Sequence, residues 1–325
     1  MKLNKKYIFS IIIPIYNSEL WLKQSIDSII NQSIGFENIQ LILVDDGSTD
    51  NSLEICKDYK NNYNENIELI IKNNGGVASA RNEAISFIKG EYVEFLDSDD
   101  FLSNNVLESV YSFFNEYESE IDIVSIPMNY FEGRIGEHYL NNKFIKGNRI
   151  IDLKEDFTDI FVHINSVFIK SELIKKYSFD KTLVTCEDGK MAIQLLLEKQ
   201  KYGVVNNCQY NYRLRTTQKN SLSQSAKRKK EWYIEQLINY PLWVYEYCNL
   251  KIGNIPSFVK FIVACHLQWR FKGNLNKYEI LTEFENKVYK YLLLLSIQYI
   301  DDFIIDELTQ ISKEEKEYIK SLKIN

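Results

Sequence analysis

The sequence predicts an α/β protein, with a mostly parallel, doubly wound sheet followed by an all-helical C-terminal region. Two observations carry this prediction. In the first 120 residues, the order strand, polar loop, helix occurs four times in succession, which is typical of a parallel sheet with helices on both faces. From Lys227 onwards, apolar and aromatic residues recur at helical spacing. We therefore expect an α/β domain over residues 1–225 and a helical domain over residues 226–325.

The first four expected strands are short apolar runs, which suit parallel strands that are covered on both faces. They span residues 9–15, 39–44, 67–71 and 91–96. Amphipathic patterns between them predict helices. These helices cover residues 19–31, 77–88 and 104–118, and a further one starts after Ser48 or Asp50 and stops in the Asn-rich stretch 61–66.

Beyond residue 120 the pattern is looser. Strands are expected at residues 122–128, 164–169 and 202–212, and helices at residues 170–177 and 190–199. Residues 129–156 show no clear period. Residues 216–225 are rich in Ser, Thr and Gln, which predicts a mobile loop.

Composition is that of an ordinary globular protein. Hydrophobic residues make up 45% and charged residues 26% of the 325 residues, which allows a packed core. The net charge of the chain is −6, with −8 in residues 1–225 and +2 in residues 226–325, so the main body lacks the basic footprint of a nucleic-acid-binding protein. The five cysteines show no C-x-x-C spacing, which indicates reduced thiols rather than disulfides or a zinc site.

Two basic segments bear on localisation. The first, residues 1–7, is followed by an apolar run that stops at Pro14. The run lacks the small-residue cleavage site of a signal peptide, so we interpret it as a buried strand. The second, residues 227–230, is interpreted as a solvated helix start, with contact to an anionic bilayer as the alternative. No apolar run is long enough to span a membrane. The expected location is the cytoplasm or the inner face of the cell membrane.

Three carboxylates follow the fourth strand within four residues: Asp97, Asp99 and Asp100. Carboxylates this close repel one another unless a cation or a set of donors compensates. Asp97 and Asp99 can present hard oxygens to Mg²⁺ or Mn²⁺, which such sites bind together with substrate phosphates. A turn or a helix cap is the alternative, because Asp and Ser are favoured in both.

The polar segments after the strands should meet at one crevice, because ligands of open α/β sheets bind outside the carboxyl ends of the strands. These segments are residues 14–17, 45–46 and 97–100. Neither G-x-G-x-x-G nor a P-loop motif occurs, so a phosphate would be held by a metal ion and by Arg81.

Arg213 and Arg215 precede the loop 216–225, which is a candidate lid that would exclude water. The two guanidinium groups could clamp a diphosphate when the lid closes. Solvated charges at a strand end are the alternative.

Five segments resemble, in order, the signatures of the glycosyltransferase 2 family, which has the GT-A fold. They are SIIIPIYN (10–17), VDDGSTD (44–50), GVASARN (76–82), FLDSDD (95–100) and ED (187–188). The resemblance covers about residues 8–225. It implies a metal-dependent, inverting transfer of a sugar from a nucleotide diphosphate, with UDP as the expected nucleotide, to an acceptor hydroxyl.

The resemblance also implies a donor site. Pro14 and Tyr16 would flank the base and ribose, and Asp45 or Asp46 would accept a hydrogen bond from the base. Arg81 would lie by the nucleotide, and the metal ligands would be Asp99 and Asp97. The expected donor-contacting residues also include Asp97 and Ser98 and, from the chemistry of the residues themselves, Glu187, Arg213 and Arg215.

The chemistry of the residues agrees with such a reaction. A leaving nucleotide diphosphate gains negative charge, which a metal ion stabilises as a Lewis acid. The attacking hydroxyl must lose its proton, which calls for a carboxylate base. We assign Asp188 as this base and Glu187 to a donor or acceptor hydroxyl; a helix cap is the alternative for Asp188.

Two departures from the family pattern matter. The Q-x-x-R-W motif and the transmembrane helices of processive synthases are absent, so we expect an enzyme that adds one or a few sugars. Some GT-A enzymes use a downstream histidine as a metal ligand. Here His138, His163 and His266 are interpreted as structural or exposed, which leaves the metal to carboxylates, phosphates and water.

The expected role is biosynthesis of a bacterial surface glycan, such as a capsule, a lipooligosaccharide or a cell-wall polymer. An inactive nucleotide-sugar-binding module and a nucleotidyltransferase are the alternatives; the second would need a Gly-rich, basic loop where residues 14–17 stand. The aromatic helical tail predicts a helix–helix interface, within the chain or in a homo-oligomer. An amphipathic surface for a lipid-linked glycan acceptor is the rival interpretation.

Overall fold

The structure, a computed structural model, describes residues 7–183, 185–216, 228–272 and 280–323. The chain divides into two units, which are described one at a time. The first comprises Met1–Ile151, His163–Lys181 and Gln194–Thr217, and the second comprises Asp152–Val162, Thr182–Ile193 and Gln218–Asn325. The predicted boundary between residues 225 and 226, and the candidate lid from residue 217 onwards, lie outside the described residues.

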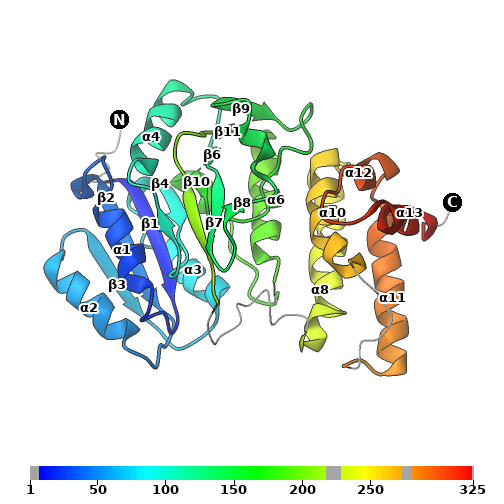
Figure 1. Cartoon of the computed structure of the whole chain (residues 1–325), viewed down its shortest axis with the longest axis horizontal. Helices are drawn as coiled ribbons and strands as arrows, with labels where there is room; N and C mark the ends of the chain where they lie inside the picture. The colour runs from blue at the N-terminus through cyan, green and yellow to red at the C-terminus, as the bar shows by residue number, and fades with distance from the viewer. Residues whose placement is uncertain (1–6, 184, 217–227, 273–279, 324–325) are drawn as a thin grey trace. The chain divides into compact units, whose positions relative to one another are not determined.

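An eight-stranded sheet forms the framework of the first unit (Figure 1). The strands from β3 to β4 run parallel, and β11 runs parallel to β6, whereas β10 lies antiparallel between β4 and β6. The predicted, mostly parallel sheet is confirmed, with β10 reversed. In spatial order the strands are β3 (Ile67–Ile71), β2 (Ile39–Asp45), β1 (Tyr7–Ile15), β4 (Gly90–Phe95), β10 (Val167–Lys170), β6 (Ile123–Ser125), β11 (Lys201–Val204) and β9 (Arg149–Asp152).

Helices cover both faces of this sheet. Phe9 and Ile11 of β1 pack in one core cluster with residues of α1, α2 and α4, while Ile12, on the other face of β1, is also fully buried. The connection from β3 back to β4 runs through α3 and, by the right-handed crossover rule, places α3 on that other face. The helices are α1 (Leu22–Ile30), η1 (Phe36–Asn38), α2 (Ser52–Asn62), α3 (Val77–Ile85), α4 (Val106–Glu116) and α5 (Ser171–Ile174).

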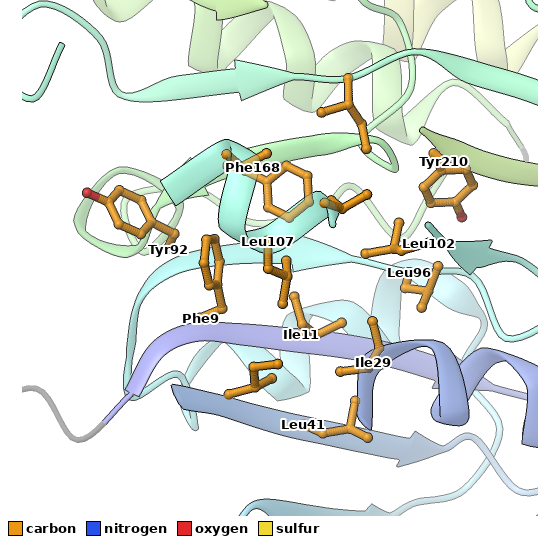
Figure 2. Close-up of a cluster of buried hydrophobic side chains, with 14 of the residues drawn as sticks. Phe9, Ile11, Ile29, Leu41, Tyr92, Leu96, Leu102, Leu107, Phe168 and Tyr210 are labelled. Carbon is orange, nitrogen blue, oxygen red and sulfur yellow. The ribbon is translucent and has the colours of Figure 1, made fainter. Parts of the chain in front are cut away.

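Aromatic side chains dominate one end of the core cluster (Figure 2). The Phe9 ring centroid lies 5.6 Å from that of Tyr92 and 5.9 Å from that of Phe168, and Tyr92 stacks on Phe114 at 4.1 Å. Each large side chain removed from water in this way contributes about 1.5–3 kcal/mol. The cluster joins the neighbouring strands β1, β4 and β10.

The predicted strand over residues 202–212 is wrong. This stretch forms parts of two strands in different sheets, because the chain leaves the large sheet after Val204 and bends at residues 207–208. Just before the bend, the Asn206 N–H donates to the Asn148 side chain at 2.9 Å. The second strand, β12, joins a smaller sheet. Its order is β5 (Phe101–Leu102), β12 (Tyr210–Leu214), β7 (Met128–Glu132) and β8 (Gly136–Glu137). Strands β7, β8 and β9, with the 3₁₀ helix η2 (Asn141–Phe144), come from residues 129–156, where the sequence shows no period.

The second unit is helical in its described C-terminal residues, as predicted (Figure 1, yellow to red). Helix α6 (Glu187–Lys199) starts in this unit, and its residues from Gln194 onwards belong to the first. Nowhere in the described ranges is a helix both long and apolar enough to cross a membrane. The other helices are η4 (Lys230–Trp232), α8 (Glu235–Leu237), the π-helix η5 (Ile238–Leu242), α9 (Trp243–Ile252), α10 (Ser257–Phe271), α11 (Glu283–Gln298), α12 (Asp302–Asp306) and α13 (Lys313–Ser321).

Candidate active site

The polar segments after β1, β2 and β4 meet at one edge of the large sheet, as predicted. The Asp46 N–H donates to the Ile15 carbonyl at 2.8 Å, which joins the ends of β1 and β2. The Ser18 and Ser98 hydroxyls lie 2.6 Å apart, which joins the ends of β1 and β4. This convergence is a consequence of parallel strands, whose carboxyl ends all point to the same edge.

The adjacent carboxylates at the end of β2 have different surroundings. Asp46 accepts hydrogen bonds from Lys72 Nζ at 2.5 Å and from the Gly76 and Gly75 N–H groups at 2.7 and 3.0 Å. Asp45 accepts from the Ser48 N–H at 3.3 Å through Oδ2, while its Oδ1 is buried and has no hydrogen-bond donor among the described residues. Of the two, Asp45 therefore retains acceptor capacity for a base.

The two residues expected to flank the nucleotide base differ in exposure. Tyr16, just after β1, is 51% exposed and can offer its ring to a planar ligand. Pro14 lies within β1 and is buried. The assignment of each to the base or ribose stays a prediction.

Asp97, the first carboxylate after β4, is engaged from two sides. Its Oδ1 accepts from Arg81 Nη2 at 3.0 Å, and its Oδ2 accepts from Asn165 Nδ2 at 3.2 Å. Arg81 is 2% exposed, and its guanidinium carbon lies 5.3 Å from the ring centroid of Phe179. Arg81 is thus linked to the segment that follows β4 through Asp97.

Asp99 is held by the two arginines of β12 and its extension. Arg215 Nε donates to Asp99 Oδ2 at 2.6 Å, and Arg213 Nε donates to the Asp99 carbonyl at 2.8 Å. Arg213 also bonds the Gln24 and Glu132 side chains. The structure therefore brings both arginines to the acidic loop, residues 97–100. Their predicted contact with a diphosphate stays a prediction.

Two further carboxyls near this loop are buried. Asp100 accepts from the Tyr210 hydroxyl and from the Arg213 N–H, both at 2.7 Å, and burial raises its pKa well above the usual range, with Asp99 and Asp97 adding to the shift. Burial, with a contribution from Asp97, likewise raises the pKa of Glu94. Raised pKa values favour the neutral acids, so the ion pairs of the loop are those of Asp97 and Asp99 with Arg81 and Arg215.

Glu187 and Asp188 belong to the second unit, where they are the first residues of α6, as predicted. Both are partly exposed, and the Lys190 N–H donates to the Cys186 carbonyl at 3.0 Å to close the first turn. Acidic side chains are favoured in a first helical turn because of the helix dipole.

Comparison with known proteins decides the family. The model of Glycosyl transferase family 2 matches residues 10–177, which contain four of the five motif segments. The chain belongs to glycosyl transferase family 2. Its fifth segment, the E-D pair, follows the matched region.

Two members of family 2 illustrate the relationship. Minor teichoic acid biosynthesis protein GgaB of Bacillus subtilis is 42% identical over 306 residues, which are 94% of this chain and 34% of GgaB. TarS of Staphylococcus aureus, a poly(ribitol-phosphate) β-N-acetylglucosaminyltransferase, is 35% identical over 126 residues, 39% of this chain and 22% of TarS. The chain spans about a third of the length of GgaB.

Solved structures show the same fold. TarS 1–349 in complex with UDP-GlcNAc matches with a TM-score of 0.73 at 22% identity, covering 97% of this chain and 87% of that one. A mannosyltransferase from Pyrobaculum calidifontis in complex with GDP-Man and Mn²⁺ matches with a TM-score of 0.51 at 14% identity, covering 92% of this chain and 88% of that one. The chain therefore has a GT-A type sheet with a helical C-terminal region.

The family 2 carboxylates fit one kind of metal site. No three His, Cys, Asp or Glu side chains of the described residues are grouped so that they could hold a metal ion. Asp97 and Asp99 supply the one or two carboxylates with which Mg²⁺-type sites begin, the other ligands being phosphate oxygens and water. The oxygen ligands of Asp97 and Asp99 thus suit a hard cation whose remaining ligands come from outside the protein. Such an ion would compete with Arg215 for Asp99 Oδ2.

Sequence reasoning missed several residues of this site. Tyr210, Asn165, Lys72 and Ser18 each bond a motif residue or its loop. Ser18 directly follows the first motif segment, whereas tertiary packing brings Tyr210, Asn165 and Lys72 there from segments without a recognisable pattern of spacing. Asn165 precedes Ser166, which has a left-handed backbone (φ 62°). A glycine at position 166 would have indicated such a conformation in the sequence, but the residue there is serine.

Proposed function

We propose that the chain transfers a sugar from a nucleotide diphosphate donor, expected to be a UDP-sugar, to a hydroxyl of a cell-wall glycan such as a teichoic acid polymer. One observation carries the proposal. The family motif residues of β1, β2 and β4 meet at one sheet edge, where two carboxylates are matched by two arginines. The 42% identity to GgaB over most of this chain supports a teichoic acid acceptor.

Donor recognition is assigned to the first unit. The Tyr16 ring would stack on the base, and Asp45 Oδ1, which lacks a donor among the described residues, would accept the hydrogen bond of the base. Ser98, Arg81 and Asp97 would contact the ribose and phosphate side of the nucleotide.

The acidic loop is assigned to the diphosphate. Asp99 and Asp97 would hold Mn²⁺ or Mg²⁺, which when bound supplies Lewis-acid stabilisation of the leaving diphosphate. Arg215 would then be released from Asp99. Both Arg215 and Arg213 could present guanidinium N–H donors to the phosphate oxygens, and a guanidinium group can bind two such oxygens at once.

Inversion is assigned to a single displacement. The acceptor oxygen forms a bond to the anomeric carbon while the bond from that carbon to the donor phosphate breaks, and the electron pair of that bond leaves with the diphosphate. Asp188 would take the proton of the acceptor hydroxyl, and Glu187 would bind a donor or acceptor hydroxyl. The motif match and the position of both residues at a helix start support these roles.

A panel of nucleotide sugars tests the proposal. With teichoic acid polymer as acceptor, we expect release of nucleotide diphosphate for one donor, loss of release with a metal chelator, and recovery with Mn²⁺. We expect Asp188→Asn to lower kcat by about a hundredfold or more without weakening donor binding, since general base catalysis contributes about 10²–10⁴-fold. Donor binding without turnover in every combination would instead indicate an inactive nucleotide-sugar-binding module.

Exposed aromatic side chains on α11 and α12 suggest a binding partner for the described C-terminal helices. Phe284 and Tyr291 of α11 are 75% and 63% exposed, and Phe303 of α12 is 51% exposed. Exposed aromatics suit a lipid-linked acceptor at the membrane surface or a second copy of the chain. Sedimentation with anionic vesicles, and the oligomeric state in solution, would separate these two proposals.

A further inference from the structure

The start of α6, which carries Glu187 and Asp188, has a strained backbone at its entry. Cys186 adopts a left-handed conformation (φ 72°), which a residue with a side chain rarely adopts unless its surroundings hold it there. The holding group is Gln236 of α8, which is 4% exposed. Its Nε2 lies 2.8 Å from Thr185 Oγ1 and 3.0 Å from Cys186 Sγ.

A second contact lies under the next turn, at Gly189. A Cβ at this position would come within 2.5 Å of His266 Cε1 and 2.9 Å of the Tyr240 hydroxyl. These side chains are not free to move aside. His266 Nδ1 lies 2.8 Å from the Tyr240 hydroxyl and 2.9 Å from the Ile262 carbonyl. Gly189 therefore permits the helix backbone to rest directly on the His266 and Tyr240 pair.

A third contact involves Lys190, which is 8% exposed. Its Nζ lies 3.7 Å from the ring centroid of Trp243 and donates to the Asn239 carbonyl at 3.2 Å. Asn239 belongs to the π-helix η5, a geometry that is common at functional sites. Three positions around the start of α6, residues 186, 189 and 190, thus contact residues of α8, η5, α9 and α10 in the C-terminal region.

We propose that Gln236, Tyr240 and His266 are positioning residues that orient the first turn of α6, and with it the carboxylate of Asp188. The proposal rests on the proposed function, in which Asp188 is the base. It assigns a role to the helical region of the second unit: these helices hold a base whose placement error of about 1 Å would cost roughly a hundredfold in rate.

Tyr240→Phe and Tyr245→Phe form a matched pair. Both tyrosines are buried, at 1% and 2% exposure, and each hydroxyl makes a 2.8 Å hydrogen bond in the second unit, Tyr240 with His266 and Tyr245 with the Ser296 carbonyl. Tyr240→Phe should lower kcat by about tenfold or more with the donor KM unchanged, and should speed hydrogen exchange of the first-turn amides of α6. Tyr245→Phe should leave both the kcat and the exchange of these amides at the wild-type values.

Gly189→Ala tests the same contact from the other side. Alanine is a better helix former than glycine, so a faster exchange of the α6 first turn in this variant can only come from the clash with His266 and Tyr240. Adding His266→Ala removes the imidazole that meets the new Cβ. Because His266 is itself a positioning residue, the double variant should relieve the clash but keep a lowered kcat and a faster exchange of the first-turn amides.

The outcomes separate this inference from the proposed function. Unchanged exchange in both Tyr240→Phe and Gly189→Ala, or equal losses of kcat in Tyr240→Phe and Tyr245→Phe, would overturn the positioning role. Full transfer activity of Asp188→Asn would overturn the assignment of the base, whatever the exchange data show. Faster exchange together with an inactive Asp188→Asn and a lowered kcat in Tyr240→Phe would support both.

Discussion

Arg215 donates from Nε to the Asp99 carboxylate at 2.6 Å, and its guanidinium carbon lies 4.3 Å from the ring centroid of Trp21. Arg81 pairs in the same way with Asp97. Asp100, the next residue after Asp99, has no such arginine pair among the described residues; it is buried and accepts a hydrogen bond from the Tyr210 hydroxyl, and its raised pKa favours the neutral acid. The loop therefore limits carboxylate repulsion in two ways, by pairing two acids with arginines and by burying the third.

The Arg215 contact makes a prediction for metal binding without nucleotide. A cation that binds Asp99 must displace the guanidinium, so Arg215→Ala should bind Mn²⁺ more tightly, by roughly fivefold, which corresponds to about 1 kcal/mol. Titration of Mn²⁺ followed by electron paramagnetic resonance measures this. Lys260→Ala, which removes the 2.7 Å ion pair with Asp301 in the second unit, is the matched control and should leave the affinity unchanged. Weaker binding by Arg215→Ala would show that the arginine does not compete with the ion.

Among elements, strand β11 can lie beside β6 and under α4 only because position 203 lacks a side chain. A Cβ on Gly203 would lie 2.3 Å from Phe113 Cε1 and 2.8 Å from Ile121 Cδ1. Phe113 and Ile121 are 5% and 0% exposed, so neither ring nor methyl has space to retreat. After β11 the chain turns and enters the smaller sheet as β12, where Arg213 contacts the acidic loop through the Asp99 carbonyl.

Gly203→Ala should therefore destabilise the first unit. Overpacking of this kind costs about 1–3 kcal/mol in the free energy of unfolding. Urea denaturation measures the loss, and the added substitution Phe113→Leu should recover part of it by vacating the ring position. A single variant as stable as the wild type would mean that α4 shifts without cost.

For the whole molecule, stability should depend on pH through His138. This side chain is 7% exposed, and burial lowers its pKa to about 2, with His163, Lys143 and Arg134 adding positive charge nearby. In the unfolded chain a histidine binds a proton below about pH 6.5. Because the unfolded state then binds more protons than the folded state, His138 makes stability fall as pH decreases from about 6.5.

At pH 5 the free energy of unfolding should be lower by about 2 kcal/mol. The reason is that pH 5 lies roughly 1.5 pH units below the unfolded-state pKa, and each unit costs about 1.4 kcal/mol. His138→Gln removes the titration, so its unfolding midpoint should fall less than that of the wild type between pH 7.5 and pH 5. Thermal unfolding at both pH values measures this for each protein. If the unfolding midpoints of the two proteins fell by the same amount, the acid sensitivity would come from groups other than His138.

The sequence by itself determined the order of the four longer strands and four α-helices in the first 120 residues, although not the short β5 or η1, and the convergence of the motif segments. Periodic burial is a local property, and parallel strands necessarily bring their carboxyl ends to one edge. It also determined that Glu187 and Asp188 open a helix, because acidic residues before an apolar helical pattern are typical of a helix start.

Only the tertiary structure decided which residues complete the site. The division of residues 202–212 between two sheets, the reversed strand β10, and the pairing of Arg215 with Asp99 all depend on contacts between segments far apart in the chain. Tyr210 and Asn165 have no local signal for the same reason. Such contacts arise from packing and charge compensation across the sheet, which no window of neighbouring residues contains.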